Sequence, residues 1–547
     1  MYEDAITGRR DGQVGTLRQT QKWLLSGAII LALLSGCAKH AATPKERDLY
    51  RVKSESGPKA KKVILICVDS LMSKAIDEGI KQNKLPAFRF LMEHGQYYRN
   101  VVTSFPTMSV SIDSTLLTGT HPDEHHVPAL VWYSTEEKKV HNYGTGLLEI
   151  SRHGVDRMLA DALVHLNGSH LNPRVPTLFE ELARKGLKSG SVNGLIYRGK
   201  SGHLLSIPAW VRGPANLPKQ LKVKGPDFLA FGALSNPLAG VKKLPDNVND
   251  RFGMTNEYAV EATKYLIWND RLPDFLYVYF PDLDMRVHRK GPADLEGVIR
   301  TDRQLQALLQ AFGSREEALK KAVIIVSGDN GMAPVLPARQ GAVIDLERSL
   351  KGYDILKPGT AVTDRTELVV AVNDRMAYVY KLKPRASIGQ IAQRLKADPR
   401  IDILAWQDKG WIRVVRGGTP GEFAFRPKGR MTDRYRQAWT LDKEPAVLDI
   451  KTDNRKHTLE YGQYPDALRR LSAALHSHPG EFLVVTAKPG YELAFGGSPT
   501  HEGGAGHGAL GQEESLVPLL IGGTDRKPES LRIVDLKRYL LQLLSQR

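Results

Sequence analysis

A short apolar run, Val63-Ile-Leu-Ile-Cys-Val68, leads directly into Asp69. The same pattern recurs in Phe275-Leu-Tyr-Val-Tyr-Phe280 before Asp284 and in Ala322-Val-Ile-Ile-Val326 before Asp329-Asn330. Short, nearly continuous apolar runs rich in β-branched residues predict parallel strands that are buried on both faces. In an open α/β sheet the ligand site lies just beyond the carboxyl ends of such strands. We therefore expect these aspartates to meet at one edge of a sheet.

Carboxylates gathered at one edge need a positive charge beside them, because like charges in close contact otherwise force protonation. Asp284 and His288 are four residues apart after a strand, so a helical turn lets both reach one point. His507 lies in a glycine-rich segment, Gly503-Gly-Ala-Gly-His-Gly508, in which the backbone can approach a ligand closely. His501 is the alternative to His507. One aspartate and two histidines form a ligand set suited to Zn²⁺.

A second candidate set contains only oxygen ligands. It comprises Asp69, Asp329, Asn330 and a hydroxyl from the region of Ser109. Oxygen ligands favour a harder ion such as Mg²⁺, Mn²⁺ or Ca²⁺. Each residue taken alone also fits a structural role, as a helix N-cap or a hydrogen-bonded histidine. Two neighbouring metal ions can clamp a phosphoryl group during its transfer, so the joint pattern predicts a metallohydrolase.

The chain is long enough for a large domain with an insertion. It has 547 residues, of which 41% are hydrophobic and 25% charged, as in ordinary globular proteins. Strands that alternate with helices predict an α/β fold with a mostly parallel central sheet and helices on both faces. We expect residues 62–338 and 480–547 to form this catalytic part. Residues 339–479 lack the regular alternation of buried strands and helices. They predict a smaller α+β insertion that forms a cap over the site.

The N-terminal region predicts export. Arg18 and Lys22 precede the apolar stretch Trp23–Leu34, which is short for a membrane span and has the flanks of a signal peptide. Leu34-Ser-Gly-Cys37 is similar to a bacterial lipobox. We expect residues 1–36 to be a lipoprotein signal peptide, Cys37 to be lipidated and residues 37–61 to be a tether; an uncleaved anchor helix is the alternative. The protein is then exported and anchored to a bacterial membrane, on its periplasmic or cell-surface side.

The basic charge of the chain does not indicate nucleic acid. The net charge is +17, but lysines and arginines are scattered rather than collected in one tract. A solvated basic surface is the simpler interpretation, and attraction of anionic substrates or lipid headgroups is the alternative. After processing, Cys67 would be the remaining cysteine, within a strand, where a buried structural thiol is expected.

Several segments together resemble the alkaline-phosphatase superfamily, and most closely its type I phosphodiesterase/nucleotide pyrophosphatase family. They are Val68-Asp69, Phe105-Pro-Thr-Met-Ser109 through Thr118-Gly119 with Pro122 and His125, Asp284 through Pro292, Ile325 through Met332, and Gly506-His507-Gly508. The resemblance implies one metal held by Asp284, His288 and His507, and another held by Asp69, Asp329, Asn330 and the nucleophile. It implies that Ser109 is this nucleophile, with Thr107 and Ser111 as alternatives.

The chain departs from the family pattern at three positions. Asn330 stands where phosphodiesterases usually have histidine, Leu130 where they have an asparagine that contacts phosphate, and His126 where they have glycine. The second metal is therefore expected to bind more weakly or to be a harder ion. A phosphate-ester small molecule is the expected substrate, with Trp132 and Tyr133 beside its leaving group.

Two other functions remain open on the sequence alone. One is a sulfatase or phosphomonoesterase of the same superfamily, but the Ser104–Met108 segment has Met108 where a sulfatase needs arginine. The other is a non-catalytic surface binding lipoprotein whose second metal site has decayed at Asn330. The oligomeric state is not indicated by any motif.

Overall fold

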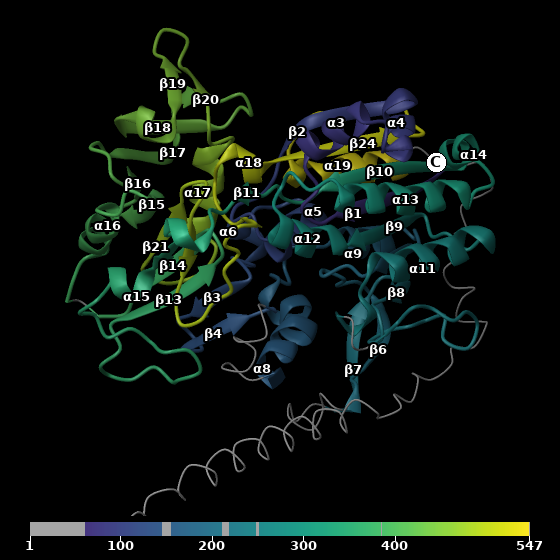
Figure 1. The fold of residues 1–547 in the computed structure, drawn as a ribbon, viewed down its shortest axis with the longest axis horizontal. Coiled ribbons are helices and arrows are strands. Elements are labelled where there is room, and N and C mark those ends of the chain that lie inside the picture. Colours follow the sequence, from purple (N-terminus) through teal and green to yellow (C-terminus); the bar gives the residue numbers. More distant parts are fainter. Residues whose placement is uncertain (1–60, 145–154, 210–217, 248–250, 384, 546–547) are drawn as a thin grey trace, which may run out of the picture.

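The computed structural model describes residues 61–144, 155–209, 218–247, 251–383 and 385–545. A seven-stranded sheet forms its centre (Figure 1). In spatial order its strands are β2 (Gly95–Val102), β24 (Leu516–Gly522), β10 (Ala322–Gly328), β1 (Lys62–Val68), β9 (Phe275–Phe280), β5 (Ser189–Val192) and β8 (Phe228–Ala230). The predicted signal peptide, Cys37 and the tether to residue 60 lie outside the described residues.

The register of the central strands brings the three predicted runs to one edge. Strands β10, β1, β9, β5 and β8 run parallel to one another, whereas β24 is antiparallel to both of its neighbours, β10 and β2. Val68 is opposite Phe280 on one side and Gly328 on the other, so β1, β9 and β10 end level with one another. The predicted mostly parallel sheet is confirmed.

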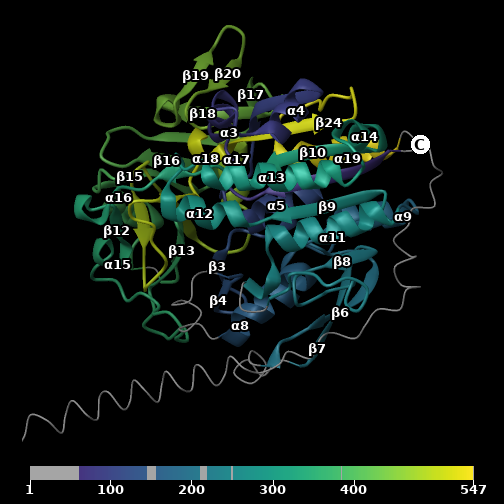
Figure 2. The ribbon, with the colours of Figure 1, turned by 45° about the vertical axis from the view of Figure 1, so that its right-hand side comes forward.

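Helices cover both faces of this sheet (Figures 1 and 2). Ile64, Ile66 and alternate residues of the other strands pack against one layer, which contains α3 (Ser73–Lys81), α4 (Pro86–Glu93), α11 (Asn256–Trp268), α12 (Asp282–Lys290), α13 (Glu296–Gln310) and α14 (Arg315–Lys321). Val63, Leu65 and Cys67 pack against the other, which contains α5 (Ser109–Thr118), α9 (Leu178–Arg184) and α19 (Ile533–Leu544). Period-two alternation in a strand with both faces buried explains its continuous apolar sequence. Cys67 is a buried free thiol, as predicted.

A second sheet of nine strands forms most of the insertion. In order its strands are β13 (Leu368–Asn373), β14 (Met376–Lys381), β21 (Phe482–Ala487), β15 (Ile401–Asp408), β16 (Trp411–Arg416), β17 (Phe423–Thr432), β20 (Thr458–Tyr461) and β19 (Ile450–Asp453), with β18 (Ala438–Lys443) paired to β17. The helices α15 (Leu346–Ser349) and α16 (Ile388–Lys396) pack on one face, and α17 (Ala467–Leu475) packs on the other.

One strand corrects the predicted domain boundary. A boundary at residue 479 assigns Phe482–Ala487 to the catalytic part, whereas β21 pairs with β14 and β15 in the second sheet. A strand buried on both faces has the same apolar sequence in either sheet, so its composition does not reveal which sheet it joins. The chain returns to the central sheet with β24.

Short ribbons and helices complete the described structure. The ribbons are β3 (Val131–Ser134) with β4 (Lys139–Asn142), β6 (Ser201–Ser206) with β7 (Gln220–Gly225), β11 (Ala333–Pro334) with β23 (Ala505–Gly506), and β12 (Val343–Asp345) with β22 (Glu492–Ala494). The remaining helices are α6 (Pro122–His125), α8 (Val155–Ala160), the π-helix η1 (Asp161–His170), η2 (Arg251–Gly253), η3 (Ala338–Gln340), η4 (Pro445–Leu448) and α18 (Gln512–Ser515). Among the described residues, no helix has both the length and the apolar character needed to cross a bilayer.

Candidate metal centre

The level ends of β1, β9 and β10 place acidic side chains beside one another. Asp69 follows β1 directly, and Asp329 follows β10. After β9 the chain forms α12, which carries Asp284 in its first turn and His288 in its last turn. The helical turn expected from the four-residue spacing is therefore present.

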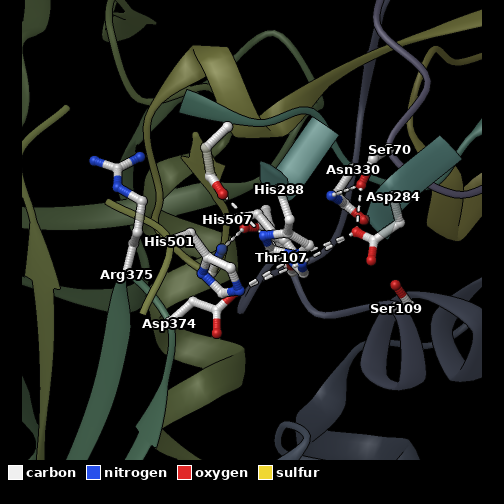
Figure 3. A network of polar contacts seen from close by, with 12 residues as sticks. Ser70, Thr107, Ser109, Asp284, His288, Asn330, Asp374, Arg375, His501 and His507 are labelled. Carbon is white, nitrogen blue, oxygen red and sulfur yellow. Dashed lines mark hydrogen bonds and ion pairs between the residues drawn. The ribbon is translucent and has the colours of Figure 1, made fainter. Parts of the chain in front are cut away.

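Asp284, His288 and His507 form one group of potential ligands (Figure 3). Nε2 of His288 lies 3.3 Å and Nε2 of His507 lies 3.7 Å from Oδ1 of Asp284. Nδ1 of His288 is 2.8 Å from the Ala505 carbonyl, and Nδ1 of His507 is 2.5 Å from the Thr107 carbonyl. A carbonyl oxygen only accepts, so in both rings Nδ1 donates, and Nε2 is the nitrogen that faces Asp284 and would bind a cation in place of a proton.

The charges around this group favour a cation. Burial opposes ionisation of His288, but the carboxylates of Asp284 and Asp374 raise its pKa to about 10. Burial also disfavours the Asp284 carboxylate, yet His288 and His507 hold its pKa below the usual value. The position that Nε2 of His288 faces therefore favours positive charge, which a divalent ion would supply in place of a proton.

Asp69, Ser109, Asp329 and Asn330 lie together as the second group. The Ser109 hydroxyl donates to Oδ1 of Asp69 over 3.3 Å. Oδ1 of Asp329 accepts the backbone N–H groups of Ser70 and Asn330, at 2.9 and 2.7 Å. Within the described part of the chain, Oδ2 of Asp329 and Oδ1 of Asn330 are buried and accept no hydrogen bond. Buried acceptors are costly without a partner, so these oxygens fit a divalent cation.

The carboxylates of both groups repel one another. Burial raises the pKa of Asp69 well above its usual range, and the charges of Asp284 and Asp329 raise it further. The Tyr279 hydroxyl donates to Oδ2 of Asp69 and partly offsets this. Cations bound between these residues would relieve the repulsion.

Ser70 connects the two groups and had no signal in the sequence. Its hydroxyl donates to Oδ1 of Asp284 over 2.9 Å and accepts the side-chain amide of Asn330 over 3.0 Å (Figure 3). It is fully buried, and its φ of 59° places it in the left-handed region. Such a conformation is unusual for serine and is common at functional sites.

The three hydroxyls considered as nucleophiles lie in different surroundings. Thr107 donates its hydroxyl to the Ala509 carbonyl over 3.1 Å, and Ser111 donates to the Val127 carbonyl over 3.0 Å. Both side chains are fully buried. The Ser109 hydroxyl is half-buried and lies against the Asp69 carboxylate, so among these three it is the one at the ligand groups.

Asp374 and His501 extend the first group. Asp374 and Arg375 form the turn between β13 and β14 in the second sheet, and Asp374 has a φ of 53°. Oδ2 of Asp374 lies 3.9 Å from Nε2 of His288, and the His501 ring stacks on His288 with ring centres 4.0 Å apart. His288, Asp374 and His501 also form a group with metal-ligand spacing. Asp374 was missed because a polar residue between two strands indicates an ordinary turn.

The two predicted substrate-binding residues are buried in the β3–β4 ribbon. Trp132 is 7% exposed and packs against the rings of His141, His170 and His478. Tyr133 is 2% exposed and packs on Tyr380. Their role toward a substrate stays a prediction.

The other departures from the family pattern lie nearby. His126 caps α6 with a φ of 63°, a conformation that glycine adopts at least cost. The turn thus keeps a left-handed residue although the glycine is absent. Leu130 is half-buried and packs against both the central core and the core of the second sheet.

Solved structures share this fold. Human ectonucleotide pyrophosphatase/phosphodiesterase 5 aligns with a TM-score of 0.53 and 15% identity, over 88% of this chain and 95% of that chain. An inactive form of the murine protein in complex with AMP aligns with a TM-score of 0.51 and 15% identity, over the same shares of the two chains. Phosphonoacetate hydrolase from Sinorhizobium meliloti, in complex with phosphonoacetate, aligns with a TM-score of 0.52 and 17% identity, over 89% of this chain and 96% of that chain. At these identities the likeness shows the fold alone.

Sequence comparisons are consistent with this fold. No curated protein matches the chain. The family model of type I phosphodiesterase/nucleotide pyrophosphatase matches residues 63–509, which include both ligand groups and the whole second sheet. The chain therefore belongs to the type I phosphodiesterase/nucleotide pyrophosphatase family.

Proposed function

We propose that this protein is an exported, lipid-anchored, metal-dependent phosphodiesterase of the nucleotide pyrophosphatase type, with Ser109 as its nucleophile. Its family consists of phosphoester hydrolases that depend on metals. The observation that carries the proposal is the position of the Ser109 hydroxyl, which donates to Oδ1 of Asp69 over 3.3 Å and lies against the Asp329 carboxylate.

The proposed reaction has two displacements at phosphorus. Bound divalent ions would lower the pKa of the hydroxyl and offset the charge that develops on the phosphoryl oxygens. Ser109 Oγ gives its proton to solvent and forms a bond to phosphorus while the bond to the leaving oxygen breaks, and this oxygen departs with its organic group. Water then attacks phosphorus, the bond from phosphorus to Oγ breaks, a proton returns to Oγ, and the phosphomonoester is released. Burial of Asp69 and Asp329 keeps competing water away from these residues.

The two groups should differ in their metal preference. Asp284, His288 and His507 present one oxygen and two imidazole nitrogens, which suits Zn²⁺. The second group lacks a histidine because position 330 is asparagine, and its oxygens accommodate Zn²⁺, Mn²⁺, Mg²⁺ or Ca²⁺ with lower affinity for zinc.

The test is turnover of three chromogenic substrates by the purified protein: a phosphodiester, a phosphomonoester and an aryl sulfate. We expect hydrolysis of the diester, lost with chelator and lost in Ser109→Ala. Ser111→Ala is the matched control, because it removes a neighbouring hydroxyl that donates to the Val127 carbonyl instead. Turnover of the sulfate alone would establish a sulfatase. Metal binding without any turnover would establish a binding lipoprotein.

The anchor requires a separate test. Cys37 follows Leu34-Ser-Gly, so lipidation at this cysteine should place the protein in the membrane fraction. Cys37→Ser should release an exported protein into the soluble fraction and abolish labelling with a fatty acid. Labelling that persists in this variant would contradict the assignment of Cys37.

A further inference from the structure

A second cluster of potential ligands lies in the β3–β4 ribbon and the neighbouring π-helix η1. Its members are Glu137 in the ribbon turn, His141 in β4 and His170 at the end of η1. One ligand atom from each lies within 4.8 Å of the others. His141 is 1% exposed and His170 is 9% exposed, whereas the Glu137 side chain reaches the surface. None of these residues belongs to the two groups at the central sheet.

The hydrogen bonds of His141 determine which ring nitrogen is free. Nδ1 of His141 lies 3.2 Å from Oδ1 of Asp161. Because a carboxylate oxygen accepts, Nδ1 of a neutral His141 ring carries the hydrogen, and Nε2 is the nitrogen that can bind a cation. A carboxylate behind a histidine in this way is the usual support of a metal-binding imidazole.

Nε2 of His141 has no hydrogen-bond partner. It is buried, and within the described residues no group donates to it. Its neighbour is Oε2 of Glu137, 3.5 Å away, which as a carboxylate oxygen can only accept. Two acceptors that face each other without a donor between them are costly, and a cation between them removes this cost.

His170 completes the cluster from the other element. Nδ1 of His170 is 2.7 Å from the Tyr143 hydroxyl, and the ring centres of His141 and His170 are 4.4 Å apart. A neutral imidazole is the form that binds metals. When Nδ1 donates to the Tyr143 oxygen, Nε2 is the nitrogen that can serve as a ligand.

We propose that Glu137, His141 and His170 form an additional binding site for a divalent transition-metal ion, with a ligand set that suits Zn²⁺. The ion would join the β3–β4 ribbon to η1. It would also act on the main site through the ribbon, since the backbone N–H of Val131 in β3 donates to the Asn373 side chain over 2.8 Å. Asn373 directly precedes Asp374, so the ion would stabilise the turn that faces His288.

The experiment measures zinc in the full-length protein after chelation, reloading and removal of excess metal. It is carried out in the unaltered chain and in Asp284→Asn/His288→Ala, in which the zinc ligands at the central sheet are impaired. We expect His141→Ala to remove one zinc per chain in both backgrounds. His94→Ala is the matched control, because this exposed histidine at the end of α4 faces a phenylalanine ring instead. Its zinc content should equal that of its parent.

A second variant at an exposed residue tests the proposal even if His141→Ala fails to fold. Glu137→Gln alters a carboxylate whose side chain is 55% exposed, so the chain should fold, and zinc affinity at this site should fall about tenfold or more. Far-ultraviolet circular dichroism verifies the fold of each variant. Unchanged zinc content in folded His141→Ala, together with unchanged affinity in Glu137→Gln, would overturn the proposal. Because the readout is bound metal in a background without the catalytic zinc ligands, the outcome is independent of whether Ser109 is a nucleophile.

Discussion

Oδ2 of Asp374 lies 3.9 Å from Nε2 of His507, which joins the second sheet to the ligand group at the central sheet. The same oxygen lies 3.9 Å from Nε2 of His288. Through this turn the insertion takes part in the electrostatics of the candidate centre, in addition to any role as a cover.

Asp374→Ala should weaken zinc binding at the first group. The substitution removes a carboxylate that faces two ligand histidines, so we expect the affinity to fall by about tenfold to a hundredfold. The measurement is a zinc titration against a competing chelator. Asp364→Asn is the control, because it removes an exposed carboxylate from the same insertion. Equal affinities in the two variants would show that Asp374 does not act on the metal.

Asn330→His should strengthen zinc binding at the second group. Imidazole is a better zinc ligand than an amide oxygen, and the buried Oδ1 of Asn330 accepts no hydrogen bond from the described residues. Metal analysis should show a higher occupancy by a second zinc, and turnover should need less added metal. If stoichiometry and affinity do not change, residue 330 is not a ligand.

Arg375→Met should destabilise the fold strongly. Arg375 forms a buried ion pair with Glu514 and donates to the Ala487 and Tyr491 carbonyls over 2.8 and 3.0 Å. Removing one partner leaves a buried charge, which costs about 3–5 kcal/mol of the free energy of unfolding. Urea unfolding gives this quantity.

The matched control for Arg375 is an exposed pair in the same insertion. Arg385 is 64% exposed and pairs with Glu367, so Arg385→Met should change the stability by at most about 1 kcal/mol. A similar loss of unfolding free energy in both variants would mean that the buried Arg375 pair contributes no more to stability than the exposed pair.

The stability of the protein should fall in acid because of buried neutral histidines. Burial lowers the pKa of His125 to about 3, below the unfolded value of about 6.5. The unfolded chain therefore binds the proton first, so the contribution is complete above about pH 6.5 and is lost as the pH falls toward 3. At pH 5 the stability lost relative to neutral pH amounts to about 2 kcal/mol for one histidine.

His125→Gln isolates this contribution. Its free energy of unfolding should fall less than that of the unaltered protein when the pH changes from 7.5 to 5, with a difference of about 2 kcal/mol. Urea unfolding at both pH values measures it. Parallel pH profiles for the two proteins would show that His125 does not control the acid response.

The strands of the central sheet could be predicted because burial constrains them. The runs that became β1, β9 and β10 cannot tolerate a charge until the strand ends, so Asp69 and Asp329 mark both a strand end and a place at the sheet edge. The four-residue spacing of Asp284 and His288 likewise predicted a helical turn, and α12 confirms it.

Other parts of the site left no such pattern. Asp374 lies in a hairpin turn, where an aspartate is common for local reasons, and only the folding of the second sheet brings it to His288. Ser70 follows Asp69 in an unusual backbone conformation that no periodicity predicts. The position of β21 depends on pairing with strands distant in sequence, which composition does not encode.

The Ser70 hydroxyl has a consequence for the proposed binding of ions at the two ligand groups. It donates to Asp284 in one ligand group and accepts from Asn330 in the other. An ion bound at either group would therefore change the orientation of a hydroxyl that is hydrogen-bonded to the other group. Such an influence is mutual by thermodynamic necessity. If both groups hold ions as proposed, the affinity of each group for its ion should therefore change when the other group is filled, by the same factor in both directions.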